Sequence, residues 1–205
     1  ENIKVDEMVR RYLKKRLRGT YTSGIEIERS QSELRVILST ARPGLVIGRS
    51  GENAAKLRTD LTAVVQKASG NALPAGKQVK LDINEVRQPE PDAAVVAYMV
   101  AEGLEKRMPF RRVLKQTVEK VIAAREVEGV RIAVSGRLGG AEMSRKEEVK
   151  KGRIPLQTFR ADIDFAHEQA YLPYGVIGIK VWIFRGNVYQ DKKTAVRLPE
   201  STPRG

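Results

Sequence analysis

The first third of the chain passes from a helical hydrophobic pattern to a strand pattern. Residues 3–18 place apolar side chains at helical spacing with Lys and Arg between them, which predicts an amphipathic helix. After a glycine-bounded break at residues 19–24, apolar and charged residues alternate from Ile25 to Leu38. This alternation predicts two strands, joined at the polar turn Ser30-Gln31-Ser32.

The next segment predicts a loop between a short helix and a long one. An apolar run at residues 45–47 precedes Gly48-Arg49-Ser50-Gly51, and a helical pattern then continues to Ala68. Ser69-Gly70-Asn71 is expected to end that helix, and residues 79–83 alternate as a third strand. The predicted order is helix, strand, strand, short helix, long helix, strand.

The Pro-rich segment Gln88-Pro89-Glu90-Pro91 predicts a domain boundary, because proline interrupts both helices and central strands. We therefore expect one domain at residues 1–88 and a second at residues 89–205.

The second domain shows two helical patterns and then strand patterns. The helices are expected at residues 92–107 and 111–126, and the β-rich stretches at 130–135, 158–165 and 177–184. A glycine-rich turn at 136–140 and a basic stretch at 144–153, expected to be a loop, separate the first two β-rich stretches. The predicted fold class is α+β, with helices packed on a mostly antiparallel sheet.

Charge narrows the class of partner. Lys and Arg outnumber Asp and Glu by 38 to 25, a net charge of +13, and the excess is present in both halves of the chain. A folded protein this positive attracts polyanions, of which nucleic acid is the commonest large one. An anionic membrane surface is the rival partner, but the sequence shows no long basic amphipathic helix with Trp or Phe anchors.

Composition also bears on the compartment. The sequence contains no Cys, which excludes disulfides and thiolate metal sites and is typical of a reducing compartment. No apolar stretch approaches the length of a membrane span, and no signal peptide is visible. We therefore predict a cytoplasmic protein with no membrane partner and no cofactor.

The loop Gly48-Arg49-Ser50-Gly51 is the feature best suited to nucleic-acid contact. Its glycines let the backbone approach phosphates, the following helix start offers free N–H groups, and Arg49 adds a positive charge. Alone, a Gly-x-x-Gly pair is weak evidence, because glycines also simply close turns. Within the predicted element order, the loop resembles that of a KH domain of the second topological type, which clamps a few nucleotides.

Arg111, Arg112 and Lys115 open the helix that follows Pro109. Arg111 and Lys115 share a helix face, and basic side chains at a helix start oppose the dipole, so they contribute little to stability. Residue chemistry leaves two interpretations open: contact with an anionic partner, or a solvated charged face.

The densest basic cluster lies in the stretch 144–153, where Glu147 and Glu148 temper its charge. Its members are Arg145, Lys146, Lys150, Lys151 and Arg153. It is expected either to contact a phosphate backbone or to form a solvated loop with weak local ion pairs.

Evidence for catalysis is thin. His167 is the only histidine, and no nucleophile–base spacing surrounds it. Asp162 and Asp164 alternate on a predicted strand where Arg160 can neutralise them, so we expect a structural salt bridge rather than catalysis or metal binding. Trp182 lies in a mostly apolar run and is expected in the core rather than as a platform for stacked bases.

Five sequence blocks resemble bacterial small-subunit ribosomal protein S-three, and they occur in that family's order. The most distinctive is Ser135-Gly136-Arg137-Leu138-Gly139-Gly140-Ala141-Glu142. The others are Ala41-Arg42-Pro43-Gly44-Leu45-Val46-Ile47-Gly48, Glu85-Val86-Arg87, Arg160-Ala161-Asp162-Ile163-Asp164 and Tyr174-Gly175-Val176-Ile177-Gly178-Ile179-Lys180-Val181-Trp182-Ile183.

The resemblance implies a non-enzymatic protein of the small ribosomal subunit head, with an N-terminal KH domain and a C-terminal α+β domain. Implied partners are small-subunit rRNA, mRNA and neighbouring ribosomal proteins, typically proteins ten and fourteen. The motif Phe110-Arg111-Arg112-Val113-Leu114-Lys115 matches a basic helix start at the mRNA entry channel, where it assists unwinding of structured mRNA. RNA contact is expected at Gly48, Arg49, Ser50, Gly51, Arg137, Arg145, Lys146, Lys150, Lys151, Arg153 and Arg160.

A DNA-acting enzyme is the alternative from another class. Relatives of this family in nucleated cells have been linked to an abasic-site lyase activity, and an exposed Lys could in principle form a Schiff base. The sequence pattern places no Lys in a recognisable desolvated pocket, so we prefer the structural RNA-binding function.

Overall fold

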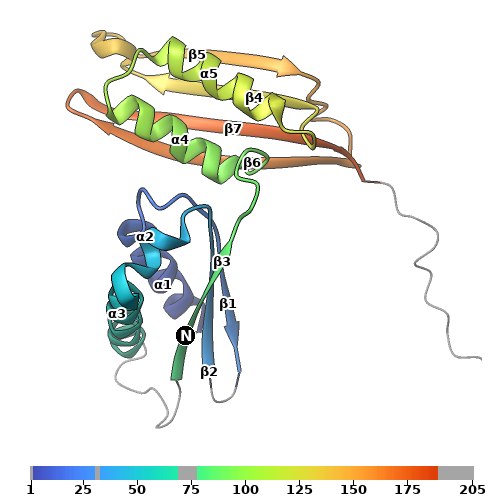
Figure 1. Ribbon diagram of the computed structural model, residues 1–205. Coiled ribbons are helices and arrows are strands. Elements are labelled where there is room, and N and C mark those ends of the chain that lie inside the picture. Colours follow the sequence, from blue (N-terminus) through green and yellow to red (C-terminus); the bar gives the residue numbers. More distant parts are fainter. Residues whose placement is uncertain (1, 31–32, 69–77, 189–205) are drawn as a thin grey trace, which may run out of the picture.

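The computed structural model describes residues 2–30, 33–68 and 78–188, which form two units, each with its own sheet (Figure 1). The first sheet has the strand order β1-β2-β3, and the second has the order β5-β4-β7-β6. Within these described ranges β2 pairs with β3 in parallel, and the other strand pairings are antiparallel. The predicted α+β class with mostly antiparallel sheets is therefore confirmed.

The first unit has the predicted order of elements. These are α1 (Asn2–Arg16), β1 (Thr22–Arg29), β2 (Glu33–Thr40), α2 (Pro43–Ile47), α3 (Glu52–Ala68) and β3 (Gln78–Glu85). The helices cover one face of the sheet, and Val9, Leu13, Val36, Leu38 and Leu61 are completely buried between the two layers. The predicted turn residues Gln31 and Ser32, and the predicted helix end at 69–71, lie outside the described residues.

The second unit places two helices on one face of an antiparallel sheet (Figure 1). Its elements are α4 (Ala93–Glu105), α5 (Phe110–Ala123), β4 (Gly129–Gly136), β5 (Arg145–Gly152), β6 (Ala161–Leu172) and β7 (Gly175–Asn187). Alternate residues of the two central strands, such as Ile132, Ile179 and Ile183, are fully buried under the helices.

The prediction of a basic loop at 144–153 is wrong. Residues 145–152 form β5, an edge strand paired with β4 along its whole length. The strand is rich in Lys and Glu and contributes only Val149 to the core, so its sequence lacks the apolar alternation that marks a strand. Charged side chains are common on edge strands, where they discourage pairing with other chains. The stretch expected at 158–165 is also shifted, because β6 begins at Ala161 and continues to Leu172.

The prediction that Trp182 lies in the core is wrong as well. Val181 and Ile183 are completely buried on the helix side of β7, and strand alternation sends Trp182 to the opposite face. Trp182 is half-buried there. Its ring centroid lies 5.2 Å from the ring centroid of Phe165 and 4.9 Å from the guanidinium carbon of Arg131.

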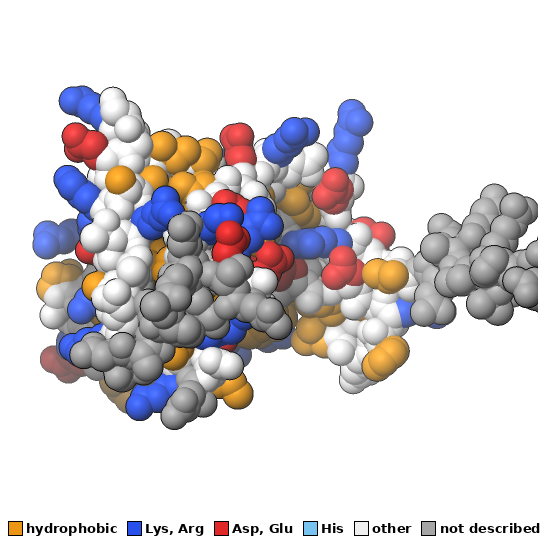
Figure 2. Space-filling view, turned by 90° about the horizontal axis from the view of Figure 1, so that it is seen from below, with side chains coloured by type: hydrophobic (Ala, Val, Ile, Leu, Met, Phe, Trp, Pro, Cys, Tyr) orange, Lys and Arg blue, Asp and Glu red, His pale blue; other side chains and the backbone are white. Residues whose placement is uncertain are grey.

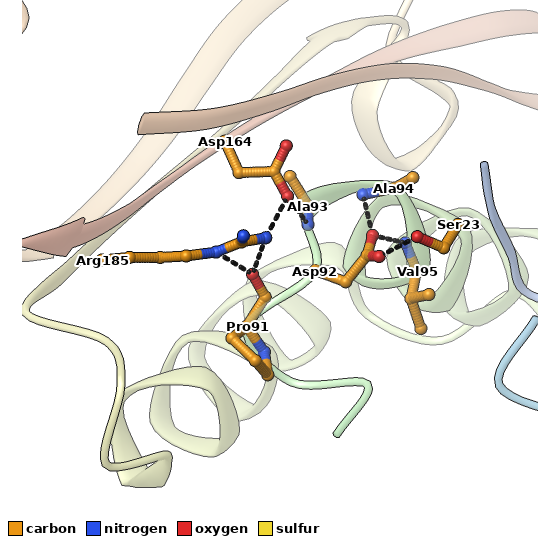
Figure 3. A network of polar contacts seen from close by, with 8 residues as sticks. All are labelled: Ser23, Pro91, Asp92, Ala93, Ala94, Val95, Asp164 and Arg185. Carbon is orange, nitrogen blue, oxygen red and sulfur yellow. Dashed lines mark hydrogen bonds and ion pairs between the residues drawn. The ribbon is translucent and has the colours of Figure 1, made fainter. Parts of the chain in front are cut away.

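The two units meet at the start of α4, which Asp92 caps (Figure 3). One Asp92 carboxylate oxygen accepts hydrogen bonds from the N–H groups of Ala94 at 2.9 Å and Val95 at 3.1 Å. Ser23 of β1 donates a hydrogen bond to the other oxygen. The same side chain therefore starts a helix of the second unit and holds a strand of the first.

Arg185 of β7 fixes the segment just before this helix (Figure 3). Its Nη2 donates to the Pro91 carbonyl at 2.8 Å and to the Asp164 carboxylate at 2.7 Å, and that carboxylate also accepts from the Ala93 N–H at 2.8 Å. Asp164 thus has the expected structural salt bridge, with Arg185 as a partner.

Residues between α1 and β1 add further contacts to α4. Tyr21 adopts a φ of 53° and donates its hydroxyl hydrogen bond to Glu102. Arg18 forms an ion pair with Glu105 and donates to the Gln169 carbonyl of β6 at 3.0 Å. α4 is therefore held by both units.

Candidate nucleic-acid interface

The loop between α2 and α3 has a left-handed backbone at three of its four residues. The φ angles are 73° at Gly48, 51° at Ser50 and 80° at Gly51. Residues 49–51 form a short 3-10 turn that leads directly into α3, and the Arg49 and Ser50 side chains are exposed. The turn presents backbone, a hydroxyl and one guanidinium to solvent at the start of a long helix, a position that favours anions. The predicted loop is therefore in place with the geometry that backbone approach to phosphate requires.

The two glycines have different roles in this loop. A Cβ at Gly48 would lie 2.6 Å from the Asn53 side-chain nitrogen, so Gly48 is needed for the turn itself. A Cβ at Gly51 would have nothing within 4 Å. The open side of the loop is thus at Gly51, where the φ of 80° still favours glycine, and Gly48 lies on the closed side beside Asn53.

Apolar side chains beside the loop are a feature that the sequence interpretation missed. Leu45 is 55% exposed and Ile47 is 40% exposed, whereas Val46 between them is buried. The available signal was length: three successive apolar residues in a five-residue helix cannot all face the same core. Exposed apolar side chains next to a turn that can contact phosphates are suited to contact with bases.

The starts of α5 and β5 form one basic surface, although in sequence they are separate clusters. We call Arg111, Arg112, Lys115 and Arg145 the α5–β5 surface. One Glu147 carboxylate oxygen lies 3.2 Å from Arg111 Nη2 and 3.3 Å from Arg145 Nη2. The Phe110 ring centroid lies 5.6 Å from each of the two guanidinium carbons. Glu147 and Phe110 therefore hold both arginines together.

Glu147 sets the charge of this surface. The hydrogen bond from Arg111, with the positive charges of Arg111 and Arg145, holds the pKa of Glu147 below its usual range. The carboxylate is therefore ionised and cancels part of the local charge. Arg112 and Lys115 are exposed and form no ion pair with any described residue, so their charges are available to an anionic partner.

The other predicted residues of β5 are divided between the two faces of its sheet. Pairing places Lys146 opposite Ser135 and Lys150 opposite Arg131, on the face away from the helices. Lys151 lies on the helix side, opposite the buried Val130. Lys146 is 3.6 Å from Glu148, whereas the exposed Lys150, Lys151 and Arg153 have no ion pair within the part of the chain that is described.

Arg137 and Arg160 occupy loops outside these surfaces. Arg137 Nε donates to the Ala141 carbonyl at 2.9 Å, and its Nη1 donates to the Tyr174 carbonyl at 3.4 Å, so this side chain stabilises the glycine-rich turn. Arg160 is exposed just before β6. Contact of either with RNA stays a prediction.

The predicted RNA-binding residues do not form one continuous site. The 48–51 loop belongs to the first unit, whereas β5 is the edge of the second sheet farther from it (Figure 1). A view from the side of the first unit shows Lys and Arg interspersed with Asp and Glu (Figure 2). Among the described residues there is no group of three or more potential metal ligands, and none of their helices is long and apolar enough to cross a membrane.

The first unit and its loop define a class of protein. A helix–strand–strand–helix–helix–strand order, a mixed three-stranded sheet and a Gly-x-x-Gly turn before the long helix are the features of a type II KH module. Residues 8–91 match the family model of the KH domain, and residues 100–183 match that of the C-terminal domain of ribosomal protein S3.

Several curated relatives carry the name small ribosomal subunit protein uS3. The chain is 42% identical over 204 residues to the relative from Synechocystis, covering 100% of this chain and 81% of the relative. It is 46% identical over 187 residues to that of Oleidesulfovibrio alaskensis, covering 91% and 83%. With the Pseudomonas aeruginosa protein it shares 44% identity over 199 residues, covering 97% and 82%. The chain belongs to the uS3 family of ribosomal proteins, which agrees with the prediction that it is not an enzyme.

Proposed function

We propose that this protein is a structural constituent of the small ribosomal subunit that binds rRNA and borders the mRNA entry channel. The observation that carries the proposal is identity above 40% to small ribosomal subunit proteins along nearly the whole chain. The net charge of +13 supports it, since a polyanionic partner is needed to offset that charge.

Contact with rRNA is assigned to the 48–51 loop and to the basic side chains of the second unit. The loop offers a positive-φ backbone and Arg49 at a helix start, and exposed Leu45 lies beside it. β5 offers Lys150 and Lys151 as phosphate contacts that need not break an ion pair seen in the structure. Phosphate contacts of this kind position a protein on RNA rather than read its sequence.

Contact with mRNA is assigned to the α5–β5 surface. Arg112 and Lys115 project from a helix start, where their charges oppose the dipole, so folding alone does not account for them. We infer that they hold the phosphates of incoming mRNA just before it becomes single-stranded. Unwinding is then passive: fixed positive charge keeps strands apart while translocation supplies the work.

The implied protein partners are ribosomal proteins ten and fourteen, and the implied location is the cytoplasmic ribosome. A direct test of the assembly is co-sedimentation with small subunits after a high-salt wash. We expect the protein to stay with the subunit, because a structural constituent is held by many contacts at once. Release into the supernatant at a salt concentration that leaves other ribosomal proteins bound would overturn the assignment.

The mRNA role has its own test, the double variant Arg112→Ala/Lys115→Ala. Both side chains are exposed, so folding and subunit assembly should be preserved. Translation of an unstructured message should be near normal, whereas a downstream hairpin should slow elongation disproportionately. Lys120→Ala/Arg125→Ala is the matched control, because it removes two exposed charges in the last turn of α5 and just beyond it. Equal slowing on both templates would indicate a general assembly defect instead.

A further inference from the structure

The face of the second sheet that points away from α4 and α5 carries a row of aromatic and basic side chains. Cross-strand pairing sets Lys150 of β5 opposite Arg131 of β4, Arg131 opposite Trp182 of β7, and Trp182 opposite Phe165 of β6. The row therefore runs across all four strands. We call it, with Lys146 and Lys180 on the same face, the outer sheet face.

The aromatic end of this row is open. Phe165 is 51% exposed, and its ring centroid is 5.2 Å from that of Trp182 at an interplanar angle of 38°. Both helices of the unit cover the opposite face (Figure 1). Trp182 already packs against the Arg131 guanidinium, whose carbon lies 4.9 Å from its ring centroid, so Phe165 is the ring left exposed. An exposed aromatic ring beside a second ring on a sheet surface indicates a partner.

The charges on this face identify the chemistry of that partner. Lys146, Lys150 and Lys180 are exposed, and Glu148 is the carboxylate that pairing places among them. Glu148 is already engaged, because Arg131 Nη2 lies 2.6 Å from it and that hydrogen bond lowers its pKa. Lysines around exposed aromatic rings complement single-stranded nucleic acid, whose bases stack on such rings while its phosphates pair with ammonium groups.

We propose that the outer sheet face binds single-stranded RNA, with bases stacking on Phe165 and Trp182 and phosphates held by Lys150 and Lys180. This site is separate from the 48–51 loop and from the α5–β5 surface, and it rests on the proposed function, since an RNA-bound protein is assumed. Neighbouring aromatic rings on a sheet accept about two bases. Lys150 lies in the same pairing row as the rings and Lys180 in the next row, where both can reach the connecting phosphates.

Trp182 provides the test, because it is the single tryptophan of the chain. A short unstructured RNA oligonucleotide titrated into the 205-residue protein should quench its fluorescence to saturation. Phe165→Ala should weaken this binding about tenfold, the usual loss of one stacked base. Lys180→Glu should weaken it too and should make the affinity less dependent on salt, because one phosphate contact is lost. Phe159→Ala is the matched control: that ring is fully exposed but lies in the loop before β6, so binding should be unchanged.

Other outcomes separate this proposal from the proposed function. If Trp182 is not quenched while filter binding to an rRNA fragment persists, the outer sheet face is not an RNA site, yet the rRNA function stands. If neither RNA binds, both fail. If RNA leaves the fluorescence of Trp182 unchanged while added small-subunit proteins protect Trp182 from quenching by acrylamide, the outer sheet face is a protein interface, and the RNA assignment is wrong. Melting curves of both Phe variants ensure that only folded protein is compared.

Discussion

At the scale of single residues, the 48–51 loop is best tested at Ser50. This residue already has a left-handed φ of 51°, a conformation that Asp and Asn tolerate better than other side chains. Ser50→Asp should weaken binding of an rRNA fragment about tenfold, because a carboxylate is placed against phosphate. Ser50→Asn has the same shape without the charge and should bind within about twofold of the parent protein. Filter binding gives the affinities, and equal loss in both variants would mean that shape, not charge, matters there.

Gly48 would be a poor place for that experiment. A side chain there meets Asn53 at 2.6 Å and forces a φ of 73° on a residue with a Cβ. Loss of RNA binding in Gly48→Asp would therefore mix a folding defect with charge repulsion. The distinction between the glycines comes from the neighbour Asn53, which sequence spacing does not place.

Glu147 is predicted to restrain the α5–β5 surface. Glu147→Gln removes the carboxylate that lies within 3.3 Å of both Arg111 and Arg145, so both guanidinium groups become available to phosphate. We expect tighter binding of single-stranded RNA, by a few-fold at low salt, and a steeper salt dependence. Glu142→Gln removes one exposed carboxylate outside the ion pairs described and is the control. Unchanged affinity in Glu147→Gln would show that RNA does not reach these arginines.

The sign of the pH dependence at Glu147 follows from its lowered pKa. Because the folded-state pKa is below the unfolded value, the ion pair stabilises the fold above the usual carboxyl range, and this contribution is lost as pH falls through the folded pKa. Glu147→Gln should therefore resemble the parent protein most closely in acid. The effect is small, since the groups are solvent-screened.

At the scale of elements, Asp92 should contribute to stability in two ways, as the cap of α4 and as a contact between the two units. Asp92→Ala removes two hydrogen bonds to N–H groups at the helix start and the contact with Ser23. We expect a loss of about 1 kcal/mol in the free energy of unfolding from the cap alone. Ser23→Ala keeps the cap and breaks only the contact between units, so it should cost less. Denaturant melts of the two variants separate the terms, and equal losses would assign the stability to the Ser23 contact.

Element prediction succeeded where one face of an element is apolar and failed where it is not. The helical pattern of residues 3–18 was readable because Val5, Val9 and Leu13 fall on one buried stripe. The strand pattern of β5 was not readable, because β5 is the charged edge strand of its sheet, its Glu147 pairs with Arg111 at the start of α5, and only Val149 packs against the core. The prediction for Trp182 failed for the opposite reason. β7 is a central strand with apolar residues on both faces, so its sequence does not show which residues face the helices.

The candidate site was predicted in parts and not as a whole. The 48–51 loop and the basic α5 start were found because glycine spacing and charge at a helix start are local signals. The junction of Arg111 with Arg145 through Glu147 spans 34 residues between the arginines and depends on which strand is at the sheet edge. That information lies in tertiary packing, which no local pattern encodes.

At the scale of the whole molecule, we propose that residues 1–88 and 89–205 are separate domains. Two buried clusters support this, since one draws only on residues before the Pro-rich segment and the other only on residues after it. Leu61→Ala should destabilise the first domain by about 2–5 kcal/mol. The unfolding transition of Trp182 fluorescence, which reports on the second domain, should shift little. If Leu61→Ala instead shifts one shared unfolding transition, the contacts at α4 couple the two domains into one folding unit.

The last prediction concerns the net charge of these 205 residues. The net charge is +13. If the basic side chains contact RNA, binding must release counterions from the RNA phosphates. If about six phosphates are contacted, the logarithm of the association constant for an rRNA fragment should fall with the logarithm of salt concentration at a slope near −4 to −5. Lys150→Ala/Lys151→Ala should reduce the magnitude of that slope by about one to two, because each lost phosphate contact removes slightly less than one unit. Lys120→Ala/Arg125→Ala should lower the net charge equally and leave the slope unchanged. A flat response in the parent protein would mean that its positive charge does not touch RNA, whereas equal changes in both double variants would mean that only total charge, and no particular surface, governs binding.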